Sequence, residues 1–338
     1  MLISVIIPCR NEEKFIEKCI TSVREFQLPV NTEIEILIID GISDDNTASV
    51  VLGLMQKDSR IQLIINEKRY QVVALNLGIK HAKGEYILRL DAHAIYPENY
   101  LMLNYITLNK TNADNVGGVI ITLPGSDNYG AQLVQALTTH KFGVGNSGFR
   151  IGATEGESDT VPYGFFKKSL IEKVGFYNEQ LVSGEDYEFN VRIKKNKGKI
   201  WLNPLIQVQY FNQSSLFRFI KKQFVREGHY NAYMWYLAPY TFTFRHSIPG
   251  AFAIGIIGGI MLSFISSLIF YIFTTIILLY ALFALISSVQ QASRYRKISF
   301  VLVLPFCFFI FHLFYGLGII SGIFKILFQL APIKKSNT

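Results

Sequence analysis

The stretch GEYILRLDAHAIYP, residues 84–97, contains a short apolar run that ends on a carboxylate and an imidazole. The run Tyr86–Leu90 is typical of a buried strand, although it carries one arginine. Side chains two positions apart on an extended chain point to the same side, so Asp91 and His93 can converge on one object. Whether the two side chains bind a metal ion, bind a proton or have no ligand must be judged from the surrounding sequence.

Strands and helices alternate through residues 1–91. Apolar runs at 3–8, 34–40, 61–66 and 85–91 predict strands, and segments at 11–26, 46–57 and 70–82 predict helices. This alternation predicts an α/β fold with a mostly parallel sheet covered on both faces. Ligands of such sheets bind beyond the carboxyl ends of the strands. The polar residues at those ends are Asn11 and Glu12, Asp40, Asn66 and Glu67, and Asp91 and His93.

The middle of the chain is less regular. Residues 117–125 predict a strand, residues 152–164 a mobile loop over the site, residues 185–200 a helix and residues 200–211 a last strand. Residues 215–236 alternate basic and aromatic side chains at helical spacing, which suits a helix lying in the membrane interface. An ordinary packed surface helix is the alternative interpretation.

The C-terminal part has the composition of a membrane domain. Residues 248–330 contain no Asp or Glu and only four Lys or Arg residues. Two or three hydrophobic helices are expected, at about 248–265, 267–288 and 299–325. The last segment either crosses the bilayer or, through Gly316, Gly318 and Gly322, re-enters or lies flat. The predicted domains are therefore a catalytic domain at 1–230, an interfacial linker at 231–247 and a membrane domain at 248–330.

Charge and cysteine content suggest where the chain works. The net charge of +8 lies partly at the edges of the apolar segments, which fits contact with anionic lipid and a multi-pass plasma-membrane protein. Three cysteines form neither a disulfide framework nor a zinc spacing, and the N-terminus does not resemble a signal peptide. A cytoplasmic catalytic domain is expected. No nucleic-acid motif accompanies the basic pI, so no nucleic-acid partner is expected.

Acidic residues after the strands carry the candidate chemistry. Asp91 and His93 are suitable ligands for Mn²⁺ or Mg²⁺ bridging a diphosphate leaving group. Glu185 and Asp186 open a helix after a glycine, so one could act as a general base, or both could simply favour the helix N-terminus. Asp45 suits an N-cap as well as a ligand contact. The first turn, PCRNEE, lacks the glycines of a dinucleotide site.

Taken together, these stretches resemble glycosyltransferase family 2, which has the GT-A fold. The matching segments are SVIIPCRNEE, ILIIDGISDDNT, ALNLGIKHAKGEYILRLDAH, VPYGFFKKSLIEKVGFYNE and GEDYEFNVRI. The LRLDAH form and the basic helix before the apolar tail look most like the succinoglycan-type exopolysaccharide enzymes.

This resemblance implies roles for individual residues. Asp91 and His93 would bind the metal, and Asp186, with Glu185 beside it, would be the base of an inverting transfer. His93 departs from the family's commoner second aspartate, and residues 223–227 match only part of the motif of processive synthases, in which Arg226 could reach the pyrophosphate. The residues implied to hold the uridine diphosphate are Pro8, Asn11, Glu12, Asp40 and Asp91.

The expected activity is transfer of a single sugar from a UDP-sugar, with UDP-glucose as first candidate, to a polyprenyl-linked saccharide in exopolysaccharide or surface polysaccharide synthesis. The expected partners are this donor and acceptor, the lipid bilayer and other polysaccharide-assembly proteins. A sugar nucleotidyltransferase would need a Gly-rich basic loop where PCRNEE is acidic. The non-enzymatic alternative is a membrane scaffold with a degenerate nucleotide-sugar domain.

Overall fold

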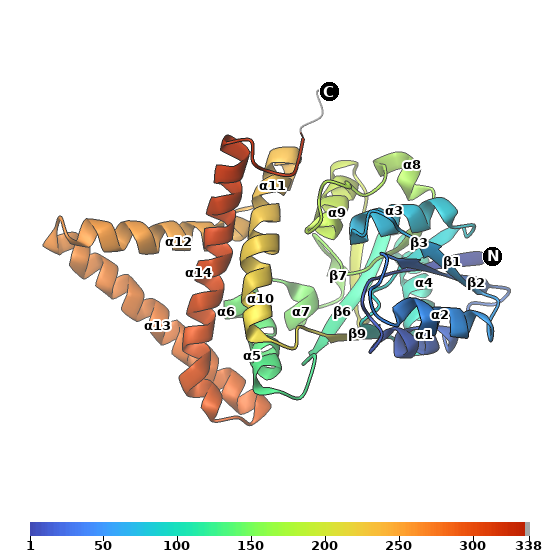
Figure 1. Cartoon of the computed structure of the whole chain (residues 1–338), viewed down its shortest axis with the longest axis horizontal. Helices are drawn as coiled ribbons and strands as arrows, with labels where there is room; N and C mark the ends of the chain where they lie inside the picture. Colours follow the sequence, from blue (N-terminus) through green and yellow to red (C-terminus); the bar gives the residue numbers. More distant parts are fainter. Residues whose placement is uncertain (335–338) are drawn as a thin grey trace. The chain divides into compact units, whose positions relative to one another are not determined.

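The computed structural model describes residues 1–334 and contains two compact units (Figure 1). The first unit combines residues 1–121 with 152–211, and the second combines residues 122–151 with the chain from residue 212 onward. Each unit is therefore built from separate pieces of the sequence. These units follow boundaries different from those expected at residues 230 and 248, and the functional division of the chain stays a prediction.

A mixed sheet forms the centre of the first unit. Its parallel part has the order β3 (Ile61–Ile65), β2 (Glu33–Asp40), β1 (Leu2–Cys9) and β4 (Tyr86–Arg89). Beyond β4 the order continues through β8, β6, β9 and β5, and β7 pairs with β9. The pairs β4–β8, β6–β8, β5–β9 and β7–β9 are antiparallel. The bounds of these later strands are β5 Ala94–Ile95, β6 Asn115–Leu123, β7 Gly156–Glu157, β8 Phe165–Lys167 and β9 Ile200–Phe211.

Helices cover this sheet because its parallel strands are apolar on both faces. Strand β1 is buried from Ile3 to Cys9, and Figure 1 shows α1 and α2 on one side of the sheet and α3 and α8 on the other. A Cβ atom at Gly78 of α3 would lie 2.5 Å from Cγ2 of Ile6, so this glycine lets the helix approach the sheet closely. The bounds are α1 Ile16–Arg24, α2 Thr47–Met55, α3 Gln71–His81, α4 Tyr100–Thr111, α8 Leu170–Val174 and α9 Glu185–Lys195. The expected α/β fold with a mixed, mostly parallel sheet is confirmed.

The second unit is helical. Within the described residues, three of its helices are long and apolar enough to cross a membrane, namely α12 (Phe244–Ser263), α13 (Ser267–Tyr295) and α14 (Ser299–Leu327). The segment expected in the membrane interface forms α10 (Leu216–Lys222), a π-helix η1 (Gln223–Gly228) and α11 (His229–Leu237). The remaining elements are α5 Tyr129–Thr138, α6 Lys141–Val144, α7 Gly148–Ile151 and the 3₁₀ turn η2 Pro239–Thr241.

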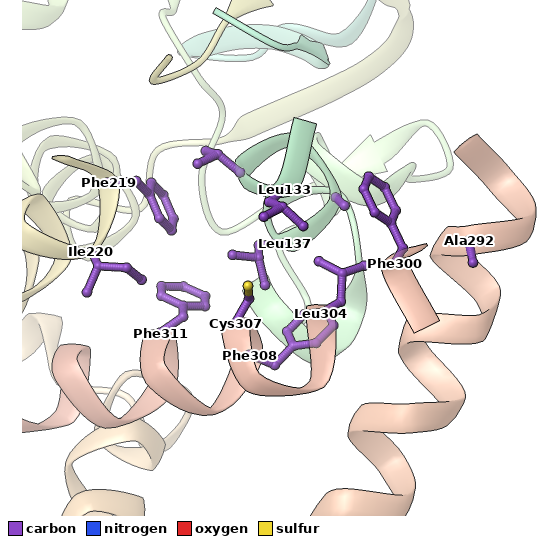
Figure 2. Close-up of a cluster of buried hydrophobic side chains, with 12 residues drawn as sticks. Leu133, Leu137, Phe219, Ile220, Ala292, Phe300, Leu304, Cys307, Phe308 and Phe311 are labelled. Carbon is purple, nitrogen blue, oxygen red and sulfur yellow. The ribbon is translucent and has the colours of Figure 1, made fainter. Parts of the chain in front are cut away.

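Helix α5 packs against the apolar C-terminal helices. Figure 2 shows Leu133 and Leu137 of α5 facing Leu304 and Phe308 of α14. Phe219 of α10 is buried in the same cluster. Full burial of a side chain of this size contributes about 1.5–3 kcal/mol. The segment around residues 129–144 therefore belongs structurally with the apolar tail, which its own sequence does not indicate.

Glycines on α14 permit close helix packing. Helix α14 is continuous, and a Cβ atom at Gly322 would lie 3.0 Å from Cβ of Ala232 in α11. A Cβ atom at Gly228 of η1 would lie 2.8 Å from Cα of Gly318. Small residues let helices approach closely in membranes. The glycines thus lie at a helix–helix contact, and whether α14 crosses the bilayer stays a prediction.

Candidate active site

The candidate site is formed where β1, β2 and β4 end. Cys9 pairs with Asp40 across β1 and β2, and Ile6 pairs with Arg89 across β1 and β4, so the three strand ends are neighbours. The turns after β1 and β2 pass through Asn11 and Ile42, whose φ angles are 59° and 54°. A left-handed conformation is a real outlier for a β-branched residue such as Ile42. Strained residues of this kind cluster at functional sites.

The first two turns are cross-linked by hydrogen bonds. Asn11 Oδ1 accepts a bond from the backbone N–H of Asp44 at 2.8 Å, and the Asn11 N–H donates to Ser43 Oγ at 2.9 Å. Ser43 Oγ donates to Asp40 Oδ1 at 2.5 Å, and the Ser43 N–H donates to Asp40 Oδ2 at 3.1 Å. Asp40 is only 2% exposed and holds this turn. The expected contact of Asp40 with the uridine diphosphate part of a sugar donor stays a prediction.

Asp45 and Pro8 have local structural roles. Asp45 Oδ1 accepts a bond from the backbone N–H of Thr47, the first residue of α2, but the N-cap of this helix is Asn46, so the expectation that Asp45 itself is the N-cap is wrong by one residue. Pro8 lies within β1, where it pairs with Ile39 of β2.

His93 and Glu12 form a pair across the site. Nδ1 of His93 lies 2.9 Å from Glu12 Oε1, and its ring lies 5.0 Å from that of Tyr210. Burial lowers the pKa of His93, but Tyr210, Glu12 and Asp91 outweigh burial and raise that pKa to about 10. Two residues away, Asp91 Oδ1 accepts a bond from Gln71 Nε2 at 3.4 Å and forms an ion pair with Arg89.

These side chains suit a divalent cation that also binds a substrate diphosphate. A carboxylate holding Nδ1 of a histidine orients the ring and leaves Nε2 as the metal ligand, as Glu12 can do for His93. Within residues 1–334, no group of three or more His, Cys, Asp or Glu side chains could hold a metal by itself. Mg²⁺ is typically bound through one or two carboxylates together with substrate phosphates, and a single imidazole favours Mn²⁺. Metal binding needs the neutral imidazole, so an ion would have to displace the proton that the raised pKa keeps on His93. With that proton released, the donor set of Asp91 and His93 fits such an ion.

Arg89 joins the two halves of the site. Its Nη2 lies 3.2 Å from Asp91 Oδ1 and 3.9 Å from Glu185 Oε1, and its Nη1 lies 3.1 Å from Asp186 Oδ2. The guanidinium carbon lies 5.2 Å from the ring centre of Tyr163. The predicted metal ligand Asp91 and the predicted base Asp186 thus meet through one cation. Sequence reasoning assigned no role to this arginine, although a charge inside an apolar strand requires buried partners.

Asp186 has the electrostatics of a general base. Burial raises the pKa of its carboxyl and Asp91 adds to this effect, whereas Arg89 opposes it, so that the pKa is raised to about 6. A base works best when its pKa lies near the working pH. Asp186 and Glu185 begin α9 directly after Gly184, whose φ of 81° suits glycine and sets the entry of the chain into the helix.

Arg226 lies in the second unit, in the π-helix η1. Short π-helical turns occur often at functional sites. The expected contact of Arg226 with the pyrophosphate of a donor stays a prediction.

Comparison with known proteins shows extensive similarity. The model of the family "Glycosyl transferase family 2" matches residues 4–174. A dolichyl N-acetyl-α-D-glucosaminyl phosphate 3-β-D-2,3-diacetamido-2,3-dideoxy-β-D-glucuronosyltransferase of Methanococcus voltae is 31% identical and is covered over 97% of its length by 96% of this chain. The succinoglycan biosynthesis protein ExoA of Rhizobium meliloti is 29% identical, over 63% of this chain and 64% of that protein.

A solved structure shares the fold. The mannosyltransferase PcManGT from Pyrobaculum calidifontis, determined with GDP-Man and Mn²⁺, matches 97% of this chain and 87% of its own, with a TM-score of 0.61 and 17% sequence identity. At 17% sequence identity this match supports the fold of the chain and no particular activity.

Proposed function

Since the chain belongs to glycosyl transferase family 2, we propose that it transfers a single sugar from a UDP-sugar to a lipid-linked saccharide, with inversion at the anomeric carbon. The observation that carries this proposal is the half-buried carboxylate of Asp186, which one guanidinium joins to Asp91. A base for the acceptor hydroxyl then stands beside the residue that would hold the donor diphosphate.

The residues of the first unit would divide the reaction between them. Asp186 takes the proton of the acceptor hydroxyl, whose oxygen attacks the anomeric carbon from the face opposite the nucleotide. Asp91 and His93 would hold Mn²⁺ or Mg²⁺, and such an ion would stabilise the negative charge of the departing diphosphate. An α-linked donor then gives a β-linkage.

The names of the relatives suggest the acceptor. The relative from Methanococcus voltae is named for action on a dolichyl-phosphate-linked N-acetylglucosamine. The three apolar helices would hold this chain at a bilayer, where tethering raises the effective concentration of a lipid-borne acceptor. We propose a multi-pass plasma-membrane location with the first unit on the cytoplasmic side, in company with other polysaccharide-assembly proteins.

A transfer assay tests the proposal. Full-length protein in detergent is given polyprenyl-phosphate N-acetylglucosamine and a panel of radiolabelled UDP-sugars, beginning with UDP-glucose and UDP-linked acetamido sugars, with Mn²⁺, Mg²⁺ or EDTA. Label is expected in the lipid fraction with a metal but not with EDTA. Asp186→Asn should lower transfer by about 100-fold or more.

The matched control for this assay is Asp127→Asn, which changes an exposed aspartate of the second unit and should leave transfer unchanged. Folded protein that releases no nucleotide from any donor, with this acceptor present, would contradict the enzymatic proposal and favour a scaffold.

A further inference from the structure

The guanidinium of Arg89 uses its two ends on different carboxylates. Nη1 contacts Asp186 Oδ2, and Nη2 contacts Asp91 Oδ1. The other oxygen of Asp186, Oδ1, is buried and has no hydrogen-bond partner among the described residues. Arg89 therefore pairs with one oxygen of the proposed base, and the second oxygen has no partner of its own.

Arg89 itself is immobilised from several sides. Its backbone N–H donates to the carbonyl oxygen of Gly164 at 3.0 Å, and its guanidinium lies over the ring of Tyr163. Tyr163 has a φ of 65°, a conformation that a bulky residue adopts only when its surroundings impose it. The side chain of Arg89 is only 4% exposed, so its guanidinium is engaged with the protein and not with solvent.

From this geometry we propose that Arg89 is a positioning residue, whose forked contacts hold the carboxylate of Asp186 at a fixed place relative to Asp91. This inference rests on the proposed function, because it takes Asp186 as the base and Asp91 as the donor-side residue. The donor side and the acceptor side of the reaction are then aligned by one buried residue.

The charge of Arg89 supports the same role. The charged and titratable groups around Asp186 come from several elements. They are Arg89 in β4, Asp91 just after β4, Tyr177 in the segment before α9, and Glu185 on α9 itself. Among these groups Arg89 is the cation, and it alone lowers the pKa of Asp186 against burial and Asp91. Without this cation, Asp186 would hold its proton to a higher pH.

Two substitutions distinguish the effect of the positive charge of Arg89 from the effect of the forked geometry that places this charge. Arg89→Met removes the charge and should lower kcat by about 100-fold and move the acid side of the pH–rate profile up by about one unit or more. Arg89→Lys keeps a charge but not the fork, so it should lower kcat by about tenfold while leaving the acid side of the profile in place.

The matched control is Arg192→Met on α9, the helix that carries Asp186. It breaks the ion pair of Arg192 with Glu188, whose side chain is 2% exposed, and the bonds of Arg192 to the carbonyl oxygens of Val174 and Phe176, and so loosens the same helix while leaving Arg89 in place. Its thermal stability should fall, while the acid side of its profile stays at that of the unchanged protein.

The outcomes distinguish this inference from the proposed function. If Asp186→Asn abolishes transfer but Arg89→Met keeps the original kcat and pH profile, only the role of Arg89 is overturned. That role is also overturned if Arg192→Met reproduces the kinetics of Arg89→Met, because a loosened helix would then explain them. If Asp186→Asn transfers as fast as the unchanged protein, the proposed function itself fails. Should Arg89→Met not fold, Arg89→Lys decides by its kcat, which a purely structural role would leave unchanged.

Discussion

At the scale of single residues, Asp186 combines burial with a neighbouring cation. These opposing influences bring its pKa to about 6, well above that of an ordinary aspartate. The carboxylate must be deprotonated to accept a proton, so kcat should be constant above that pH and fall about tenfold for each unit below it. The measurement is a pH–rate profile at saturating donor and acceptor.

The raised pKa of Asp186 also predicts how stability depends on pH. As the pH rises toward about 6, kcat should increase, whereas the contribution of Asp186 to the free energy of unfolding should decrease. The folded state holds the proton of Asp186 more tightly than the unfolded state, which releases it at the ordinary aspartate pKa of about 3.9. The contribution of Asp186 to the free energy of unfolding is therefore largest at low pH and declines as the pH rises toward about 6. Between these pH values, Asp186→Asn should show a weaker decline with pH than the unchanged protein. A profile identical in both proteins would contradict the raised pKa.

His93 sets the expected metal preference. An imidazole ligand favours Mn²⁺ over Mg²⁺, whereas a carboxylate suits both. Transfer by the unchanged protein should therefore be faster with Mn²⁺, and His93→Asp should raise the rate with Mg²⁺ relative to that with Mn²⁺. The check is the ratio of rates with each metal at saturation. An unchanged ratio in His93→Asp would place the ion away from this side chain.

At the scale of elements, the glycines of α14 offer a matched comparison. A Cβ atom at Gly318 would collide with the carbonyl oxygen of Phe224 in η1, whereas one at Gly255 in α12 would meet nothing within 4 Å. Gly318→Ala should therefore destabilise the second unit by about 1–3 kcal/mol, the typical cost of overpacking. Gly255→Ala should be neutral or slightly stabilising, because alanine favours a helix. Thermal unfolding of both variants in detergent measures the difference, and equal midpoints would contradict this packing.

The elements that sequence could predict are those with a strong local pattern. The four parallel strands are continuous apolar runs, and the three long helices are apolar for about the length of a bilayer crossing. Helix α5 could not be recognised in this way, because its ten residues include small and polar ones and its partners lie far along the chain. The antiparallel strands were only partly predictable, since β5 and β7 each contain two residues and owe their pairing to β9.

The candidate site shows the same limit. Asp91, Glu185 and Asp186 could be chosen because each follows a strand or opens a helix, and the structure joins them. The residue that joins them could not be chosen in this way, because the partners of Arg89 come from segments about a hundred residues apart. Pairing of a buried charge is decided by tertiary structure, so local pattern indicates only that partners must exist.

At the scale of the whole molecule, the second unit depends on both of its pieces. A chain that ends at residue 247 lacks α13 and α14 and leaves the apolar faces of α5 and α10 uncovered, including Leu133, Leu137 and Phe219. Such a truncated protein should aggregate or bind detergent instead of behaving as a soluble monomer. Gel filtration with and without detergent measures this. A soluble monomeric fragment of residues 1–247 would show that the predicted catalytic domain folds without the apolar tail.

The discontinuous second unit also bears on the order of events during synthesis. The chain passes between the units after residues 121, 151 and 211. Helix α5 leaves the ribosome well over a hundred residues before α14, the helix that covers it. At roughly 5–20 residues per second, that apolar face waits many seconds for its partner. During this interval the nascent chain needs a chaperone or an early encounter with the bilayer, so delayed targeting should harm this protein before any of its chemistry begins.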